Sequence, residues 1–459
     1  MALMTPDPTF YPSARLAIQG PPERLGYVAV LNTNGQPDAM SVVDLDPESP
    51  TYSSIVNSLE MPNVGDELHH FGWNACSASL CPYAPHPHLE RRYLIVPTLR
   101  TSRIYVIDTK PDPFSPKVVK TVEADVIANR TGYSRLHTVH CGPDAIYLNG
   151  IGSAEGGAPG GILRIDHNTF EPLGAWELDR GPQTLAYDFW WHMGLDVAIT
   201  SEWCTPDLFE NGPSLADIVA GNYGHKIHFW DLRRRRHLQE VDFGSENQMV
   251  LELRPSHNPT KAYGFVGVVV NSQDLSSSVW TWYQDGEKWA VTKVIEIPAE
   301  PADPALLPEA LKGLGTVPPL VTDLDLSLDD KFLYVSCWGS GQMRQYDVSD
   351  PFNAKLTGVV ELGGIVNKTA HPKSGPLIGA PQMVEISRDG RRVYATNSLY
   401  SSWDDTFYPN ITGWMAKFNV NPEGGLSLDE DFFVDFGEGR AHQVRLEGGD
   451  ASSDTFCYP

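Results

Sequence analysis

The chain has 459 residues, of which 41% are hydrophobic and 20% charged, and it carries 40 glycines and 37 prolines. Such a composition supports a buried core linked by many turns, and it excludes a disordered chain or a coiled coil. The formal net charge of −24 repels phosphate groups, so we expect neither nucleic acid nor an anionic membrane as a partner.

The N-terminal residues and the cysteines bear on the compartment. Residues 1–12 lack a basic start followed by an apolar stretch, and no later run approaches the roughly 20 apolar residues that span a bilayer. Six cysteines are too sparse to staple a chain of this length, which favours reduced thiols. We therefore expect a cytoplasmic protein with reduced cysteines at positions 76, 81, 141, 204, 337 and 457.

After an N-terminal arm, predicted for residues 1–20, short strand-like runs rich in Val, Ile, Tyr and Trp follow one another along the chain. The first three are YVAVLN, AMSVVDL and YSSIVNS, within residues 27–58. Four looser units of paired runs then begin near His69, His137, Ala186 and Met249. Since no segment has a helical period of the usual length, the chain is predicted to be all-β.

The repeating unit is clearest at residues 320–362, where four runs are separated by an Asp-Asp turn, a Gly-Ser-Gly turn and a Pro-bearing turn. This pattern is typical of one blade of a β-propeller. Another unit starts at residue 381 with PQMVEISRDGRRVYATNSLYSS and ends with WMAKFNV and DFFVDF. The last run, AHQVRLE at residues 441–447, has no partner left after it.

Pairing of this last run with the three N-terminal runs would complete a seventh blade and bury two open sheet edges. Residues 21–459 are therefore predicted to form a single seven-bladed propeller domain, in which the C-terminal strand joins the N-terminal blade. The alternative is an eighth blade, if the Pro-rich stretch 298–319 hides a degenerate unit. A closed ring needs no partner, so we expect a monomer or a weak oligomer.

Histidines recur at one position of the repeat. Alignment of the units by their first tight turn places His69, His137, Gln382 and His442 at the start of the innermost strand, which lines the central channel. Equivalent positions of a closed ring converge on its axis, and neutral imidazole is a common ligand of Zn, Cu, Fe and Ni. The pattern predicts a metal site. The alternative is that each histidine caps its blade by a hydrogen bond to a neighbouring carbonyl.

Two further histidines stand close to these along the chain. His70 comes one residue after His69, and His140 comes three residues after His137. An odd offset on a regular strand points a side chain to the opposite face. A bulge or an irregular strand entry would be needed to turn either of them inward.

Long loops between second and third strands, at residues 201–224 and 397–413, are predicted on the face where the inner strands begin. They bring one acid, Glu202, and several aromatic residues toward the channel mouth: Trp203, Trp338, Tyr400 and Trp403. An apolar aromatic wall beside a metal suits a small uncharged substrate.

Longer motifs carry a resemblance to a known family. They include MPNVGDELHHFGWNACS, LHTVHC, YDFWW, TSEW, GFVG, SLDDKFLYVS with RQYDVSDP, GAPQM with SLYSSWD, and the closing VDFG, AHQVR and GGDASSD. With these motifs in this order, from about residue 20 to the C-terminus, the chain resembles the selenium-binding protein family, whose members include methanethiol oxidases.

The resemblance implies a copper-dependent oxidase that converts methanethiol, dioxygen and water into formaldehyde, hydrogen sulfide and hydrogen peroxide. The histidine motifs of the family fall on five positions of this chain, which are expected to include the copper ligands: His69, His70, His137, His140 and His442. Glu202 shares its loop with Trp203 and is predicted to move a proton in this reaction. The alternative for Glu202 is a salt bridge to a neighbouring blade.

Two positions depart from the family's cysteine pattern. The CSSC-type pair reads CSAS here, with Ser79 in place of the second cysteine. Ser53 follows Tyr52 where animal relatives carry a cysteine associated with selenium. Histidine motifs retained without these thiols favour a metal enzyme over the alternative, a non-catalytic propeller that binds selenium or proteins.

A hydrolase or lactonase with a hard Ca²⁺ site is a third interpretation of the same fold. Such a site needs carboxylates in the channel, and Asp188, Asp323 and Glu385 lie near inner strands. The sequence leaves this interpretation open beside the other two.

Overall fold

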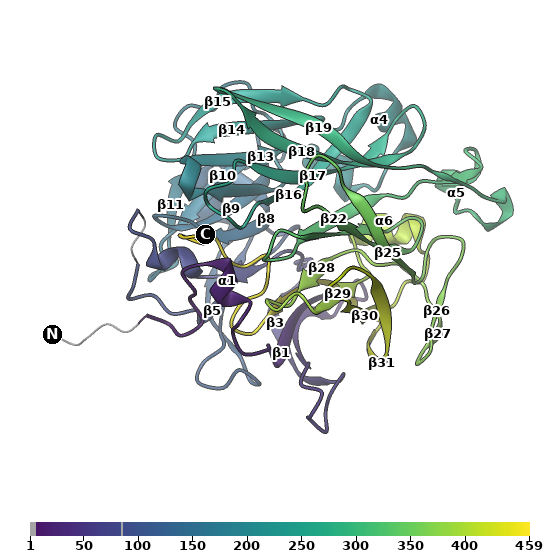
Figure 1. The fold of residues 1–459 in the computed structure, drawn as a ribbon, viewed down its shortest axis with the longest axis horizontal. Coiled ribbons are helices and arrows are strands. Elements are labelled where there is room, and N and C mark those ends of the chain that lie inside the picture. Colours follow the sequence, from purple (N-terminus) through teal and green to yellow (C-terminus); the bar gives the residue numbers. More distant parts are fainter. Residues whose placement is uncertain (1–5, 84–85) are drawn as a thin grey trace.

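The computed structural model describes residues 6–83 and 86–459, which are built mainly from β-sheets arranged around a ring (Figure 1). Seven four-stranded antiparallel sheets form the ring, which confirms the predicted all-β, seven-bladed propeller. The strands of each blade are given from the innermost outward. Blade 1 consists of β32 (Arg440–Leu446), β1 (Leu25–Leu31), β2 (Pro37–Asp44) and β3 (Ile55–Val64), and blade 2 of β4 (Gly72–Trp73), β5 (Tyr93–Pro97), β6 (Ile104–Asp108) and β7 (Lys117–Val122). Blade 3 consists of β8 (Tyr133–Cys141), β9 (Ile146–Ser153), β10 (Gly161–Ile165) and β11 (Pro172–Ala175), and blade 4 of β12 (Phe189–His192), β13 (Val197–Ser201), β14 (Lys226–Asp231) and β15 (Arg236–Asp242). Blade 5 consists of β16 (Asn247–Pro255), β17 (Tyr263–Asn271), β18 (Ser277–Asp285) and β19 (Lys288–Ile297). Blade 6 consists of β22 (Val321–Leu326), β23 (Phe332–Cys337), β24 (Gln342–Asp347) and β25 (Lys355–Glu361). Blade 7 consists of β28 (Val384–Ile386), β29 (Arg392–Thr396), β30 (Gly413–Val420) and β31 (Leu426–Gly437).

The remaining elements are short and lie in the loops. The α-helices are α1 (Ala14–Ala17), α2 (Ala124–Thr131), α3 (Pro206–Glu210), α4 (Leu215–Ala220), α5 (Glu309–Lys312) and α6 (Ser401–Phe407). The 3-10 helices are η1 (Ser77–Leu80), η2 (Met193–Leu195) and η3 (Pro304–Leu306), and two small ladders pair β20 (Glu300–Pro301) with β21 (Thr316–Val317) and β26 (Ala370–His371) with β27 (Gly375–Pro376). Among the described residues, no helix has the length and apolarity that crossing a bilayer requires.

Serine and aspartate fix the first tight turn of the clearest blades. In blade 6, Ser327 Oγ donates to Asp329 Oδ1 at 2.6 Å and accepts from the backbone N–H of Phe332 at 2.9 Å. In blade 7, Ser387 and Asp389 make the same contact at 2.5 Å. Local bonds of this kind favour a turn over continued strand pairing, so the Ser-x-Asp motif sets where the inner strands β22 and β28 end.

Apolar side chains fill the space between neighbouring blades. Between blades 5 and 6, Phe265, Val279, Leu324 and Val335 belong to one cluster and are fully buried. Burial of a large aliphatic or aromatic side chain contributes about 1.5–3 kcal/mol. Because this packing recurs around the ring, the inner strands are held as a rigid frame for the side chains that face the axis.

The last strand closes the ring. β32 pairs antiparallel with β1, with Gly26 opposite Leu446 and Val28 opposite Val444. The N-terminal blade therefore takes its innermost strand from the C-terminal end of the chain, as the sequence predicts. This pairing covers the inner edge of β1 and gives β32 a partner strand.

A chain that ends at residue 439 is expected to lose cooperative folding, because it exposes the inner edge of β1 and the apolar surfaces that β32 covers. Soluble yield and thermal unfolding followed by circular dichroism measure this effect. A synthetic peptide of residues 440–459 should restore part of the transition. A soluble truncated chain with an unchanged melting temperature would contradict the closure argument.

The N-terminal residues and the C-terminal tail lie together on the ring. Ser13 forms a parallel bridge with Tyr458, and Arg91 donates to Asp454 at 2.7 Å. The described N-terminal residues and the C-terminal tail thus contact each other, and Arg91 bonds both Asp7 and Asp454. The division into an arm, residues 1–20, and a domain, residues 21–459, stays a prediction.

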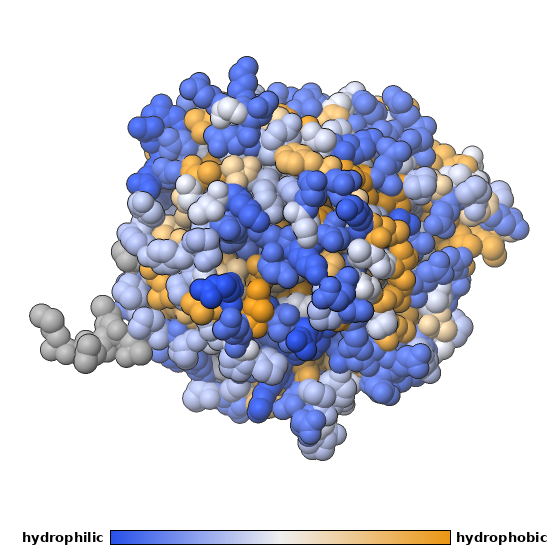
Figure 2. Space-filling view, viewed as in Figure 1, coloured by the Kyte–Doolittle hydropathy of each residue, from blue (hydrophilic) through white to orange (hydrophobic). Residues whose placement is uncertain are grey.

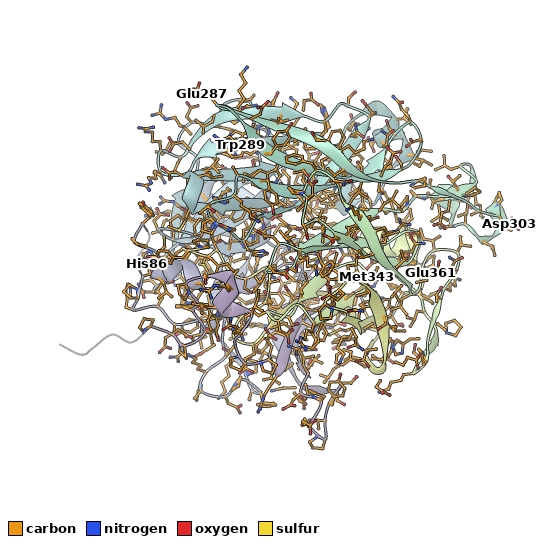
Figure 3. The ribbon with its side chains drawn as sticks, in the orientation of Figure 1. His86, Glu287, Trp289, Asp303, Met343 and Glu361 are labelled. Atoms are coloured by element: carbon orange, nitrogen blue, oxygen red, sulfur yellow. A yellow bond between two sulfur atoms is a disulfide. The ribbon has the colours of Figure 1, made fainter. Side chains whose placement is uncertain are left out.

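The Pro-rich stretch 298–319 is not an eighth blade. Within it, η3 and α5 are framed by the two-residue strands β20 and β21, and the segment projects from the edge of the ring (Figure 1). Asp303 caps η3 by accepting from the backbone N–H of Ala305 at 2.9 Å and lies at the outer tip of this lobe (Figure 3).

One pair of cysteines corrects the expectation of reduced thiols. Cys76 and Cys141 form a disulfide across 65 residues, which ties the entry to η1 in blade 2 to the end of β8 in blade 3. Ser79 does not leave Cys76 unpaired, because its partner comes from another blade. The other four cysteines are free thiols: Cys81, Cys204, Cys337 and Cys457.

Candidate metal centre

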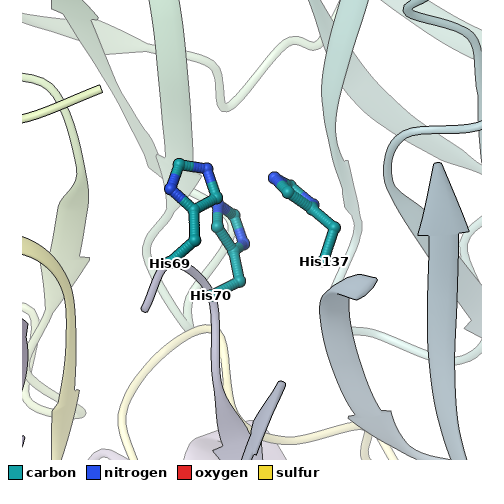
Figure 4. A group of neighbouring side chains, drawn as sticks. All are labelled: His69, His70 and His137. Carbon is teal, nitrogen blue, oxygen red and sulfur yellow. The ribbon is translucent and has the colours of Figure 1, made fainter. Parts of the chain in front are cut away.

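Four of the five predicted histidines meet where the inner strands begin. His69 and His70 precede β4, His137 lies in β8, and His442 lies in β32. One ligand nitrogen from each of His69, His70 and His137 lies within 4.8 Å of the others (Figure 4). The ring of His442 stacks on that of His69 with centroids 3.5 Å apart. Three blades, far apart in sequence, thus contribute to one cluster.

The backbone before β4 explains how two consecutive histidines reach the same place. Leu68 makes only an isolated bridge with Thr98, and regular pairing begins at Gly72. Side chains alternate between faces only on a regular strand. His70 therefore also turns toward the axis, with its ring centroid 4.0 Å from that of His137.

The nitrogen atoms of the cluster suit a metal ion. His442 Nδ1 lies 2.6 Å from the carbonyl of Ser398, which can only accept, so Nδ1 carries the proton and Nε2 keeps its lone pair. That Nε2 is buried without a hydrogen-bond partner in the described part of the chain, as are both ring nitrogens of His69 and Nε2 of His70. Buried polar atoms without a partner are costly, and a bound cation would give a partner to one lone-pair nitrogen of each of these rings.

Burial also sets the charge state of the rings. Removal from water lowers the pKa of His69, His70 and His137 well below the usual value, and it lowers the pKa of His442 to about 3. The rings are neutral at pH 7 on this account. Neutral imidazole is the form that binds a metal.

Two tyrosines cover the cluster. The hydroxyl of Tyr400 lies 3.2 Å from His137 Nε2, and its ring stacks on that of His69 with centroids 4.4 Å apart. The ring of Tyr187 lies 4.3 Å from that of His137. Both tyrosines are almost fully buried, so the histidines face aromatic surface rather than water.

A polar clamp holds Tyr400 in place at the start of α6. Glu67 accepts from the backbone N–H of Ser401 at 2.8 Å, and Asp404 accepts from the backbone N–H of Leu399 at 2.9 Å. Arg440, in β32, donates to Asp405 at 2.6 Å. The loop 397–413 is thus bonded to the blades that carry the histidines.

The three predicted tryptophans lie in one buried cluster with Tyr400. The ring of Trp203 stacks on Tyr400 at 4.8 Å and lies 6.0 Å from the ring of Trp403. Trp338 donates from Nε1 to the carbonyl of Asn397 at 3.0 Å. Trp203 and Trp403 therefore stand one and two layers beyond Tyr400, whereas Trp338 supports the loop.

Glu202 does not face the histidine cluster. Its Oε1 lies 3.0 Å from Nε2 of His228, and His228 Nδ1 lies 3.0 Å from Nε2 of His237. His228 belongs to the same blade, so the contact differs from the alternative of a salt bridge to a neighbouring blade. The catalytic role of Glu202 stays a prediction.

His140 stands apart from the other predicted ligands. Its ring packs on that of Trp190 with centroids 4.1 Å apart. Burial, together with the positive charges of Arg445 and Arg254, lowers the pKa of His140 well below its usual value. β8 is not regular between the two histidines, because its pairing with β9 shifts between Leu136 and Val139, and His140 lies opposite Tyr147 in the part that follows. The structure does not bring His140 into the cluster.

The channel carboxylates surround an arginine. Arg254 has its guanidinium nitrogens within 3.6 Å of four acids: Asp188 at 3.6 Å, Glu252 at 3.2 Å, Asp323 at 3.4 Å and Asp325 at 3.3 Å. Glu385 is paired with Arg445 at 2.5 Å. The acids of the lactonase interpretation thus have cationic side chains as partners, and within residues 6–83 and 86–459 the three histidines are the only group of metal-ligand spacing.

Sequence reasoning missed Glu252. Its Oε1 lies 4.0 Å from His70 Nε2, and its other oxygen bonds Arg254. Glu252 follows the predicted inner-strand start at Met249 by three residues. Glu252 therefore connects the histidine cluster to the group of acids around Arg254. Only an alignment of all blades would have indicated its position from the sequence.

Comparison with known proteins agrees with the motifs. The family model described as 56kDa selenium binding protein (SBP56) matches residues 4–457. Proteins named methanethiol oxidase from Xenopus tropicalis and Homo sapiens are each 39% identical, over 95% of this chain and 96% of theirs. The crystal structure of a hypothetical selenium-binding protein from Sulfolobus tokodaii superimposes with a TM-score of 0.97 at 58% identity, covering 99% of this chain and 100% of that one. The chain therefore belongs to the SBP56 family of selenium-binding proteins.

Proposed function

We propose that the chain is a methanethiol oxidase that uses copper. The reaction converts methanethiol, dioxygen and water, in equal amounts, into formaldehyde, hydrogen sulfide and hydrogen peroxide. The observation that carries the proposal is a cluster of four buried, neutral imidazoles, of which His69, His70 and His442 have ring nitrogens without a partner in the described part of the chain. Relatives over nearly the whole chain bear the name of this enzyme, and the loss of thiols at Ser53 and Ser79 disfavours a thiol-based selenium carrier.

His69, His70, His137 and His442 would hold the copper. The ion, when bound, supplies a soft site for a thiolate and a carrier for electrons on their way to dioxygen. The Ser398 carbonyl holds the Nδ1 proton of His442, which leaves Nε2 with a lone pair that a metal can use.

The aromatic residues exclude water from the site. Tyr400 and Tyr187 cover the rings, and Trp203 stacks on the outer face of Tyr400. Exclusion of water strengthens every electrostatic interaction at the site and protects reactive intermediates from side reactions. The Tyr400 hydroxyl lies 3.2 Å from His137 Nε2. If His137 binds the metal through Nε2, this hydroxyl would be free to bond the substrate.

The proposal predicts that copper-loaded protein consumes dioxygen when methanethiol is supplied and releases peroxide and sulfide in equal amounts. An oxygen electrode together with peroxide and sulfide electrodes measures all three quantities. Protein loaded with zinc instead is the matched control and should be inactive, because zinc has no redox chemistry. Stoichiometric copper without any methanethiol-dependent oxygen uptake would refute the proposed activity.

A further inference from the structure

An apolar cavity lies above the aromatic cover of the histidines. Its volume is about 50 Å³, several times what one water molecule needs. All of its lining residues are apolar or aromatic, and they include Ile218, Met249, Ala310, Leu311, Leu320 and Trp403. We call this cavity the apolar vestibule.

Three helices outside the blades supply part of the vestibule wall. Ile218 comes from α4, Ala310 and Leu311 come from α5, and Trp403 comes from α6. In Figure 1 these three helices lie on one side of the molecule, and hydrophobic residues are visible beside them in Figure 2. Leu215 and Val219 on α4 are 44% and 74% exposed. The rim is therefore apolar as well as the interior.

A stack of aromatic rings separates the inner end of the vestibule from the histidine cluster. Trp403 lines the cavity and neighbours Trp203, which stacks on Tyr400, which in turn stacks on His69. Trp403 Nε1 is buried without a hydrogen-bond partner in the part of the chain that the structure describes. An unpartnered buried donor is costly. A passing acceptor, such as a thiol sulfur, would satisfy it.

We propose that the apolar vestibule is the entry site for short, uncharged alkyl thiols and that it rejects charged thiols. This inference rests on the proposed function and adds the route and the selectivity. An alkyl thiol is neutral at pH 7 and loses little on leaving water, whereas a charged amino-acid or peptide thiol would have to shed its hydration in a cavity that offers no counter-charge. The lobe 300–317, which supplies α5, is then an outer wall of the substrate path.

Filling the cavity tests the proposal. Ile218→Trp combined with Ala310→Trp places two large side chains in the vestibule without replacing a buried core residue. The apparent KM for methanethiol is expected to rise about tenfold, with copper content and kcat at saturation retained. Ala305→Trp is the matched control, because Ala305 is exposed on the same lobe and does not line the cavity. An unchanged KM in the filled variant would overturn the proposal.

The selectivity between uncharged and charged thiols provides a second test of the proposal. The unmodified protein is expected to prefer methanethiol over cysteine by about 100-fold or more in kcat/KM, and equal values would overturn the filter. A third arm does not depend on activity: xenon should bind the unmodified protein and the Ala305→Trp control at the vestibule, as it does dry apolar cavities, and should not bind the filled variant. If the protein does not oxidise methanethiol but binds xenon there, the proposed function fails while the cavity stands. If xenon does not bind, the vestibule itself is refuted.

Discussion

Protein carrying His137→Ala together with His442→Ala is expected to lose its copper and to fall at least about 100-fold in methanethiol oxidation. The two rings come from different blades and contribute half of the four imidazoles in the cluster. The remaining pair, His69 and His70, is adjacent in sequence and cannot surround an ion by itself. Copper per chain after dialysis, measured by mass spectrometry, and peroxide release report the two effects separately.

Two controls keep this prediction falsifiable. His88 is exposed and distant from the cluster in sequence, and His88→Ala should retain copper. His442→Gln keeps an uncharged polar side chain, so it tests loss of the ligand with less loss of packing. Suppose that His442→Gln, or the double variant His137→Ala with His442→Ala, keeps its melting temperature and still holds one copper per chain at unchanged activity. The assignment of His442 as a ligand is then wrong.

Arg254→Met is expected to destabilise the fold by about 3–5 kcal/mol at pH 8. Arg254 is the shared cation of four buried acids, and removal of one partner leaves uncompensated charge in the channel. Loss on this scale is a large part of the stability of an ordinary domain. Urea unfolding followed by tryptophan fluorescence measures the change.

The loss of folding free energy caused by Arg254→Met should become smaller as the pH falls. Burial already raises the pKa of Asp188 and Asp323 well above the usual value, and Arg254 opposes this rise. A carboxyl group whose pKa is higher in the folded state binds its proton more tightly there, so its folded form gains stability as pH falls toward the unfolded pKa of about 3.9. Without Arg254 these pKa values rise further, and the difference between variant and unmodified protein is expected to be smaller at pH 5 than at pH 8.

Arg233→Met is the matched control for the arginine prediction. Arg233 pairs with Asp196 at 2.9 Å, but its side chain is 59% exposed. An exposed ion pair contributes at most about 1 kcal/mol. Equal losses for the two variants, or a loss for Arg254→Met that does not change with pH, would contradict the account of the channel.

The fold was predictable because its signals are local and repeated. Ser-x-Asp turns such as Ser327 to Asp329 mark the end of an inner strand, and alternating runs mark the strands that follow. The unpaired run at residues 441–447 and the incomplete first unit then leave one way to close the ring. The lobe at residues 300–317 was harder to interpret, because its short helices serve a cavity rather than the blade repeat.

The site was predictable as far as blade equivalence extends. His69, His137 and His442 share one position of the repeat, and a closed ring brings that position to its axis. His70 and His140 both have odd offsets, yet only His70 joins the cluster. The chain is irregular before β4, and β8 carries a register shift between Leu136 and Val139, so regular alternation decides neither position. The sequence does not reveal these irregularities.

Contacts between side chains far apart in the chain could not be predicted from the sequence. The partner of Cys76 is Cys141, 65 residues away, and no spacing rule connects them. Glu202 faces His228 while its neighbour Trp203 faces Tyr400, and only the local backbone decides which of two adjacent residues points to the axis. These details depend on register and strand entry, which composition and periodicity do not fix.

X-ray absorption at the copper edge of the reconstituted protein tests the central claim most directly. The account predicts three or four nitrogen neighbours with the multiple-scattering pattern of imidazole, in accord with His69, His70, His137 and His442. The signal should fall in the double variant that lacks His137 and His442. A first shell dominated by sulfur, or copper that carries no imidazole signature, would contradict it.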